Sequence, residues 1–307
     1  MSYRLKQHET ISDGIKRIVI EQIDKAIDRL ESQRGSQDEA IHDARVCFKK
    51  IRTVLRLVQT EFDADIFRQE NICYRDAGRR LSAIRDTAAL LETFDKLTSR
   101  FANQLAPNAF AGLRQRLKQS STARRVEKKK IMLEVARTIR TARRRVEHWP
   151  IHQDGFSALG QGVKRIYKQG RQSFANATEQ PSVENCHEWR KDVKYLWYQI
   201  RLLKPIWPMM LERLSDELER LGEYLSDDHD LTLLRQRMLE PLELPGDRTD
   251  LEALIALIDQ RRGELQVEAK RLGERVYAEK PRAFAGRLQV YWQAWRSDGH
   301  IAPVSVS

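Results

Sequence analysis

The sequence predicts an all-α protein, and three observations support this. Apolar residues recur at helical spacing along nearly the whole chain, and no stretch shows the alternation of a half-buried strand. Glycine (14 residues) and proline (9 residues) are scarce in a chain of 307 residues, whereas an all-β protein needs many turns. Charged residues make up 32% of the chain, which suits long helices with solvated faces. A chain of this length can bury a core without disulfides or a structural metal.

The apolar periodicity and the turn residues together divide the chain into helices. The first helix is expected to start near Ser12. Ser36 with Glu39 forms a capping-box pattern before the second helix, and Ser182 is a good N-cap for the sixth. The clearest loop is 241–248. The expected helices span 10–32, 37–60, 66–98, 110–148, 155–177, 183–204, 209–238, 250–279 and 282–296.

Two of the expected helices carry the same pattern 145 residues apart. In the earlier one an apolar stripe is followed, one residue later, by a polar stripe at His42, Arg45, Lys49, Arg52 and Arg56. In the later one the matching polar positions are His187, Arg190, Lys194, Trp197 and Arg201. One residue is a step of about 100° around a helix, so each polar stripe borders the buried face.

The repetition continues beyond these helices. The pattern L-S-x-x-[RH]-D occurs at 81–86 and again at 225–230. His42 precedes Asp86 by 44 residues, and His187 precedes Asp230 by 43. We therefore expect one module over 1–307 made of two halves, about 9–149 and 155–297. Each half is predicted to be a bundle of about four helices, and the halves to be related by a pseudo-two-fold that lets the two polar stripes face each other across a groove.

The chain is basic, with a formal charge of +11 and a pI near 9.6, which points to an anionic partner. The charge is uneven along the sequence. Residues 114–148 hold 13 Lys or Arg against 3 Asp or Glu, whereas 205–260 hold 5 against 14. The sequence leaves open whether the basic tract 114–148 joins the groove or forms a solvated surface.

The two polar stripes are the strongest indication of a functional site. Like charges that face each other persist only if water, carboxylates or a bound anion lie between them. Asp86 and Asp230 are candidates for such carboxylates. The stripes therefore predict an anion site, with two solvated helix faces as the alternative. His42 and His187 fit either a structural bond to a carboxylate or a hydrogen bond to the anion.

Other chemistry has weaker support. His42-Asp43 with Asp228-His229-Asp230 permits a metal-dependent phosphohydrolase, but Arg45 and Lys49 on the same face would repel a cation. Aromatics interleave with basic residues at 189–198, which permits nucleobase stacking, although core packing is the commoner use. The phosphate-binding glycine loops and the G-x-S-x-G nucleophile pattern are absent from the sequence. We expect no enzyme activity, no metal and no cofactor.

The sequence also indicates a cellular setting. Its three cysteines are odd in number and have no CxxC spacing, which fits a reducing compartment. The first residues contain no apolar segment of a secretory leader, and no apolar run reaches the roughly 18 residues of a membrane span. We therefore expect a cytoplasmic protein without membrane insertion, and self-association stays open.

The repeated motifs resemble the CHAD family, the conserved histidine α-helical domain. The resemblance rests on H-x-x-R-x-x-x-K-K-x-R at 42–52, on H-x-x-R-K-x-x-K at 187–194 and on L-S-x-x-R-D at 81–86. L-S-D-D-H-D-L at 225–231 and Tyr167-Lys168-x-x-Arg171 add to it. It covers the chain from about residue 8 to 297. The CYTH domain often fused to CHAD modules has an ExExK signature that is absent here, so the chain resembles a stand-alone member.

The resemblance implies two four-helix halves around a basic central groove or pore that binds inorganic polyphosphate without catalysis. Together with the paired basic stripes, it leads to the hypothesis that the protein attaches to polyphosphate granules. Binding residues carried over by position are His42, Arg45, Lys49, Lys50, Arg52, Arg56, Lys168, Arg171, His187, Arg190, Lys191, Lys194 and Arg201. The second half departs from the pattern, since Tyr195 and Trp197 stand where Lys50 and Arg52 stand in the first. Alternatives are a nucleic-acid-binding helical protein and a structural protein of storage granules.

Overall fold

The fold is seen in a computed structural model that describes residues 3–32, 35–82, 86–106, 109–119, 125–240 and 248–298. Regular secondary structure within these ranges is helical throughout, so the all-α prediction is confirmed. Three short 3₁₀ segments, η1 to η3, accompany the α-helices. The α-helices are α1 (Ile11–Glu31), α2 (Gln37–Leu57), α3 (Ala64–Ser82), α4 (Asp86–Arg100), α5 (Ala111–Gln119), α6 (Arg125–Val146), α7 (Ser157–Glu179), α8 (Val183–Leu203), α9 (Pro208–Leu239), α10 (Arg248–Val276) and α11 (Pro281–Asp298).

Side-chain caps explain several helix starts. Ser36 and Ser182 cap α2 and α8 as predicted, the latter by accepting a hydrogen bond from the Asn185 amide at 3.1 Å. The first helix begins one residue before the expected Ser12, at Ile11, because Thr10 caps it. Gly155, with φ of +70°, makes the turn before α7 in a conformation that side chains disfavour.

Two predicted helices are each divided in the structure. The expected helix 66–98 is wrong, because it is α3 and α4; the expected helix 110–148 is likewise α5 and α6. The connecting residues 83–85 and 120–124 lie outside the described ranges. The division has a packing reason: α3 packs on α2 and α6, whereas α4 packs on α9. Phe94 and Leu97 of α4 are buried in a separate core cluster with Leu234 and Ile258.

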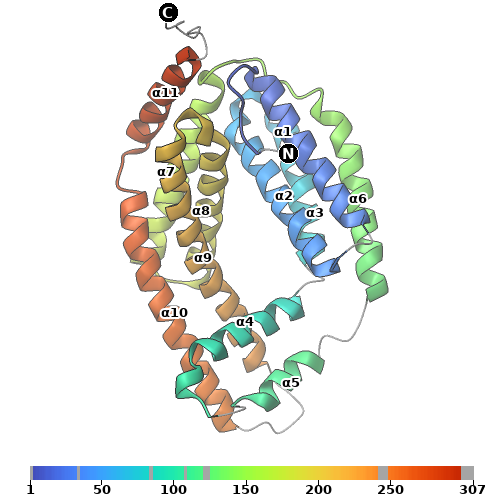
Figure 1. The fold of residues 1–307 in the computed structure, drawn as a ribbon, viewed down its shortest axis with the longest axis vertical. Helices are drawn as coiled ribbons and strands as arrows, with labels where there is room; N and C mark the ends of the chain where they lie inside the picture. The colour runs from blue at the N-terminus through green and yellow to red at the C-terminus, as the bar shows by residue number, and fades with distance from the viewer. Residues whose placement is uncertain are drawn as a thin grey trace, which may run out of the picture.

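The helices form two groups that follow the two halves of the sequence (Figure 1). α1, α2, α3 and α6 pack around one another, and α7, α8, α9 and α10 pack in series, with α11 on α7. The groups meet where α2 contacts α7 and α8. α4 and α5 belong to the first half in sequence but lie below the space between the groups, where α4 packs on α9 and α10 (Figure 1).

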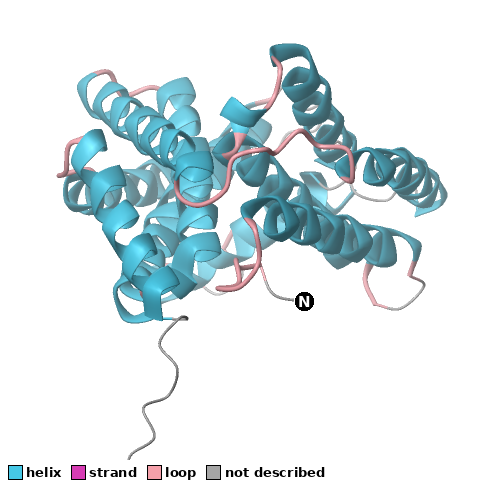
Figure 2. Ribbon diagram, turned by 90° about the horizontal axis from the view of Figure 1, so that it is seen from above, coloured by secondary structure: helices cyan, strands magenta, loops and turns pink. Residues whose placement is uncertain are grey.

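The view from above shows helices joined by loops in the part of the chain that the structure describes (Figure 2). The main core joins the apolar stripes of both central helices: Ile41, Phe48 and Ile51 of α2, and Val193 and Leu196 of α8, are all buried. α2 and α8 thus each bury an apolar stripe in this core and turn the neighbouring polar stripe toward the other group. Over the described residues, a helix with the length and apolar character of a membrane span was not found.

Candidate functional site

A pocket of about 380 Å³ lies between α2, α4, α8 and α9. The two polar stripes meet in it: α2 supplies His42, Arg45 and Lys49, and α8 supplies Arg190 and Lys194. This placement follows from the local sequence, because each stripe lies about 100° from a buried stripe on the same helix. The predicted juxtaposition of the repeated basic residues is therefore present in the structure.

Carboxylates form the opposite wall of this pocket. They are Glu92 on α4 and Glu223, Asp227 and Asp230 on α9. Lys96 of α4 lies among them, and its hydrogen bond to Glu92 together with the fields of Asp227 and Asp230 raises its pKa. Of the two carboxylates predicted to separate the stripes, Asp230 lines the pocket, whereas the side chain of Asp86 lies outside the described part of the chain. The pocket is more nearly charge-balanced than the stripes alone predict.

The cations on α8 are held in a partly desolvated setting. The Arg190 Nε donates a hydrogen bond to the Ser226 Oγ at 3.1 Å. Burial lowers the pKa of Arg190, and the field of Asp230 opposes that change. Burial, followed by repulsion from Arg190, lowers the pKa of Lys194, and Glu223 again acts in the opposite sense. Both cations are thus partly buried close to each other, so an anion placed beside them would be stabilised.

The histidines lie at one end of the same site. His42 and His229 line the pocket, and the ring of His187 lies 5.0 Å from that of His229 between centroids. Burial, then the charges of Arg190 and His187, lowers the pKa of His229 to about 4. Burial and Arg190 also lower the pKa of His187. His229 is therefore neutral near pH 7.

The lowered pKa of His229 predicts a pH-dependent stability. Between its unfolded pKa of about 6.5 and its folded value of about 4, the unfolded chain binds the extra proton. His229 therefore lowers the free energy of unfolding as pH falls through that window, and its contribution is constant below it. His229→Gln should make the decline between pH 7 and 5 shallower. Urea titrations of wild type and variant at both pH values measure this, and parallel declines would exclude it.

Three other predicted cations, Arg52, Arg56 and Arg201, lie toward the C-terminal ends of α2 and α8, beyond the residues that line the pocket. The guanidinium groups of Arg52 and Arg56 lie 5.8 Å and 4.6 Å from the ring centre of Tyr195. That of Arg201 lies 4.9 Å from the ring centre of Trp197. Tyr195 and Trp197, which replace basic residues in the second half, thus have cations over their rings. These contacts stabilise like charges that are brought together between the halves.

Lys50 and Lys191 have partners away from the pocket. Lys50 lies over the ring of Tyr3 at 5.0 Å, and burial lowers its pKa. Lys191 forms a salt bridge with Glu188 one turn away on the same helix. Neither residue is among those that line the pocket.

Two further sets of basic residues lie elsewhere. Lys168 and Arg171 are exposed on α7 and do not line the pocket between the stripes. The described part of the basic tract 114–148 lies mainly on α5 and α6, where carboxylates of neighbouring helices pair with some of its residues. These pairs are Arg114–Asp95, Lys128–Asp38, Arg140–Glu31, Arg143–Asp24 and Arg145–Glu70. These pairs offset the charge of five basic residues of the tract, and none of its described residues is among those that line the pocket.

The D-D-H-D segment was the basis of the metal alternative, but its carboxylates diverge. Asp228 is buried and faces α10, where it accepts hydrogen bonds from Arg262 Nε at 3.0 Å and Gln266 Nε2 at 2.9 Å. Asp230 faces the pocket. In the ranges that the structure describes, three or more His, Cys, Asp or Glu side chains do not gather as a metal-binding group.

The buried pair between Asp228 and Arg262 predicts a structural effect. Asp228→Ala leaves the guanidinium of Arg262, whose side chain is 19% exposed, without its carboxylate. We expect a loss of about 3 kcal/mol in the free energy of unfolding, with anion binding retained while the variant is folded. Urea unfolding monitored by circular dichroism measures it, and a loss under about 1 kcal/mol would show that the pair is dispensable.

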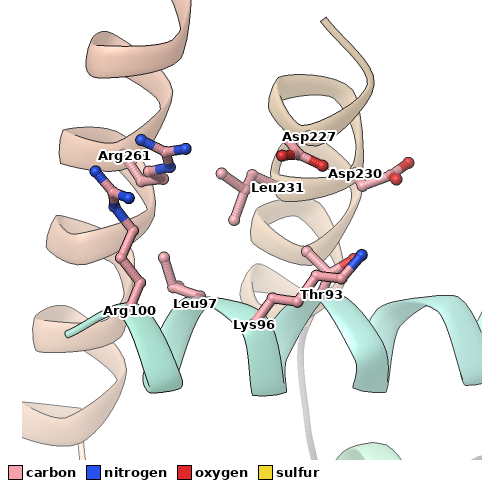
Figure 3. A pocket seen from close by; sticks show the side chains of 8 residues that line it. All are labelled: Thr93, Lys96, Leu97, Arg100, Asp227, Asp230, Leu231 and Arg261. Carbon is pink, nitrogen blue, oxygen red and sulfur yellow. The ribbon is translucent and has the colours of Figure 1, made fainter. Parts of the chain in front are cut away.

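Several pocket residues escaped the sequence analysis. Ser226, Asp227 and His229 belong to the motif that identified Asp230, but the sequence analysis assigned only Asp230 to the anion site and considered His229 only for a metal. Glu92 and Lys96 of α4 carried no such signal, because the division of the expected helix 66–98 is what brings α4 beneath the pocket. Figure 3 shows Lys96 extending from α4 toward the segment of α9 that carries Asp227 and Asp230.

Figure 3 shows a smaller pocket of about 230 Å³ that shares Lys96, Asp227 and Asp230 with the main pocket. Its far side is formed by Arg100 of α4 and Arg261 of α10. Both guanidinium groups pair with Glu264 at 2.9 Å, which fixes α4 against α10. The Arg100–Glu264 pair therefore joins α4, which forms one wall of the main pocket, to α10.

Comparison with known proteins identifies the architecture. The family model of the CHAD domain matches residues 17–239. The chain is similar to the crystal structure of the CHAD domain from the plant Ricinus communis, with a TM-score of 0.57, 15% sequence identity and coverage of 94% of each chain. A search of curated proteins gave no match. The match to the family model spans most of the sequence, including both repeated helices, and the chain therefore belongs to the CHAD family.

Proposed function

We propose that this protein binds inorganic polyphosphate without cleaving it, in the pocket where the two repeated stripes meet. The observation that supports this most directly is the meeting of Arg45 and Lys49 from α2 with Arg190 and Lys194 from α8 in one pocket. Membership of the CHAD family agrees with a ligand of this kind, as the sequence resemblance implied.

The chemistry of polyphosphate fits these side chains. The polymer carries roughly one negative charge per phosphate and presents oxygens on all sides. Cations at alternating spacings of three and four residues offer one contact about every 5 Å along a helix. Arginine can bind phosphate through two parallel hydrogen bonds, and lysine supplies a point charge. The carboxylates of the opposite wall would offset the cations in the absence of the polymer, and bound polyphosphate would replace them as the main counter-charge.

The placement of the aromatic residues favours polyphosphate over nucleic acid. Stacking on nucleobases needs an exposed ring face. Tyr195 is 5% exposed and lies beneath Arg52 and Arg56, while Trp197 takes Lys194 and Arg201 on its ring. Cations lie over both rings, so a base cannot stack there in the same position. A ligand made only of phosphate needs no contact with a ring. We extend the proposal to a non-enzymatic role in attaching the protein to polyphosphate granules in the cytoplasm.

A competition titration tests the proposed function. A labelled anionic probe bound to wild-type protein is displaced with long-chain polyphosphate, single-stranded RNA or duplex DNA at about 0.15 M salt. We expect polyphosphate to displace it at the lowest phosphate concentration. Equal competition by all three polymers would mean that the net charge acts without selectivity, and superior competition by RNA would support the nucleic-acid alternative.

A further inference from the structure

We propose that a second anion subsite, formed by the N-terminal segment, receives polyphosphate chains that extend beyond the main pocket. This inference rests on the proposed function and adds a dependence on chain length to it. The subsite is a pocket of about 640 Å³ between the N-terminal segment, the end of α8, the start of α9 and α11. Its lining includes the cations Arg4, Lys6, Arg201 and Lys204.

The charge of this subsite differs from that of the main pocket. Among the described residues that line it there is no Asp or Glu, whereas four carboxylates line the main pocket. One carboxylate approaches from outside, since Glu212 pairs with Lys204. The remaining three cations, Arg4, Lys6 and Arg201, give the subsite a clear excess of positive charge.

The wall of the subsite is held in place by hydrogen bonds to the backbone. The Leu5 amide donates to the Leu202 carbonyl oxygen at 3.3 Å, and Arg17 donates to the Arg4 carbonyl oxygen at 3.0 Å. The Gln7 side chain donates to the Trp295 carbonyl oxygen. The N-terminal segment is therefore fixed beside α8, with the side chains of Arg4 and Lys6 exposed at the pocket.

Trp197 links the subsite to the main pocket. Its ring takes the Nζ of Lys194 at 5.6 Å and the guanidinium of Arg201 at 4.9 Å. Lys194 lines the main pocket and Arg201 lines the subsite, so cations follow α8 from one pocket to the other. Trp197 occupies the position of an arginine in the first half, and here it holds two cations close together.

The spacing sets a minimum length for a chain that fills both sites. Arg190 and Arg201 are eleven residues apart on α8, which corresponds to about 16 Å along the helix. Tripolyphosphate, with three phosphates, is too short to contact both, whereas a long chain can. Simultaneous binding adds affinity because the second contact is intramolecular.

The test removes the subsite charges that are most exposed. Arg4→Ser with Lys6→Ser is compared with a matched double variant, Arg137→Ser with Arg144→Ser, which removes two exposed cations on α6 away from both pockets. Affinity for tripolyphosphate and for long-chain polyphosphate is measured by calorimetry at several salt concentrations. Circular dichroism establishes that each variant is folded.

We expect the subsite variant to lose about tenfold in affinity for the long chain. The slope of log affinity against log salt concentration should become shallower by about 1.5. Its affinity for tripolyphosphate and both affinities of the α6 variant should be unchanged. If the wild type binds long chains and the subsite variant binds them equally well, the subsite is wrong and the proposed function stands. If the wild type binds neither polymer, the proposed function itself fails.

Discussion

Reversing two charges, Arg45→Glu with Arg190→Glu, should lower the affinity for polyphosphate at least about 100-fold. The two residues come from different halves of the chain and meet in one pocket. Each reversal removes a phosphate-binding guanidinium and adds a carboxylate to a wall that faces four others. The loss is measured by competition against a labelled polyphosphate, with circular dichroism to show that the helical content is kept.

The control for this variant reverses the same number of charges elsewhere. Arg137→Glu with Arg144→Glu changes two exposed residues of α6 and gives the same net charge. We expect it to lose only a few-fold in affinity, through the weaker overall field. An equal loss in both variants would mean that binding depends on total charge, and the search for a site would move to the basic tract 114–148.

A large effect on stability is also expected for Gly162→Ala. Gly162 lies where α7 crosses the end of α2, and a Cβ built there would overlap the carbonyl oxygen of Leu57. Because the obstacle is backbone, the two halves must move apart to admit the methyl group. We expect a loss of about 3 kcal/mol in the free energy of unfolding, despite a gain of about 1 kcal/mol in helix propensity.

A second glycine supplies the control. Gly263 lies within α10, and a Cβ there would meet nothing within 4 Å. Gly263→Ala should therefore leave stability unchanged or raise it by up to about 1 kcal/mol. Urea unfolding of both variants measures the difference. If Gly162→Ala is as stable as Gly263→Ala, the close approach of α7 to α2 is not present in solution.

The parts of the site that the sequence predicted are those fixed by a single helix. The position of Arg45 and Lys49 relative to the buried face of α2 follows from the helical period, and the same holds for Arg190 and Lys194 on α8. The repetition then indicated that both stripes serve one site. The helical class likewise followed from the apolar periodicity.

The parts that the sequence did not predict depend on packing between distant segments. No glycine or proline marks the division between α3 and α4, so the helical pattern continued through it. Only the core shared by α4, α9 and α10 explains why Lys96 lies beneath the pocket. Lys168 shows the limit of carrying residues over by position, because it is exposed on α7 and outside the pocket.

The central claim is that the paired stripes of α2 and α8 form the polyphosphate site. A crystal structure of the protein with a bound polyphosphate chain tests it most directly. The structure described here predicts phosphate density between Arg45 and Lys49 on one side and Arg190 and Lys194 on the other. Phosphate bound only along the α5 and α6 surface, with this pocket left to solvent, would contradict the claim.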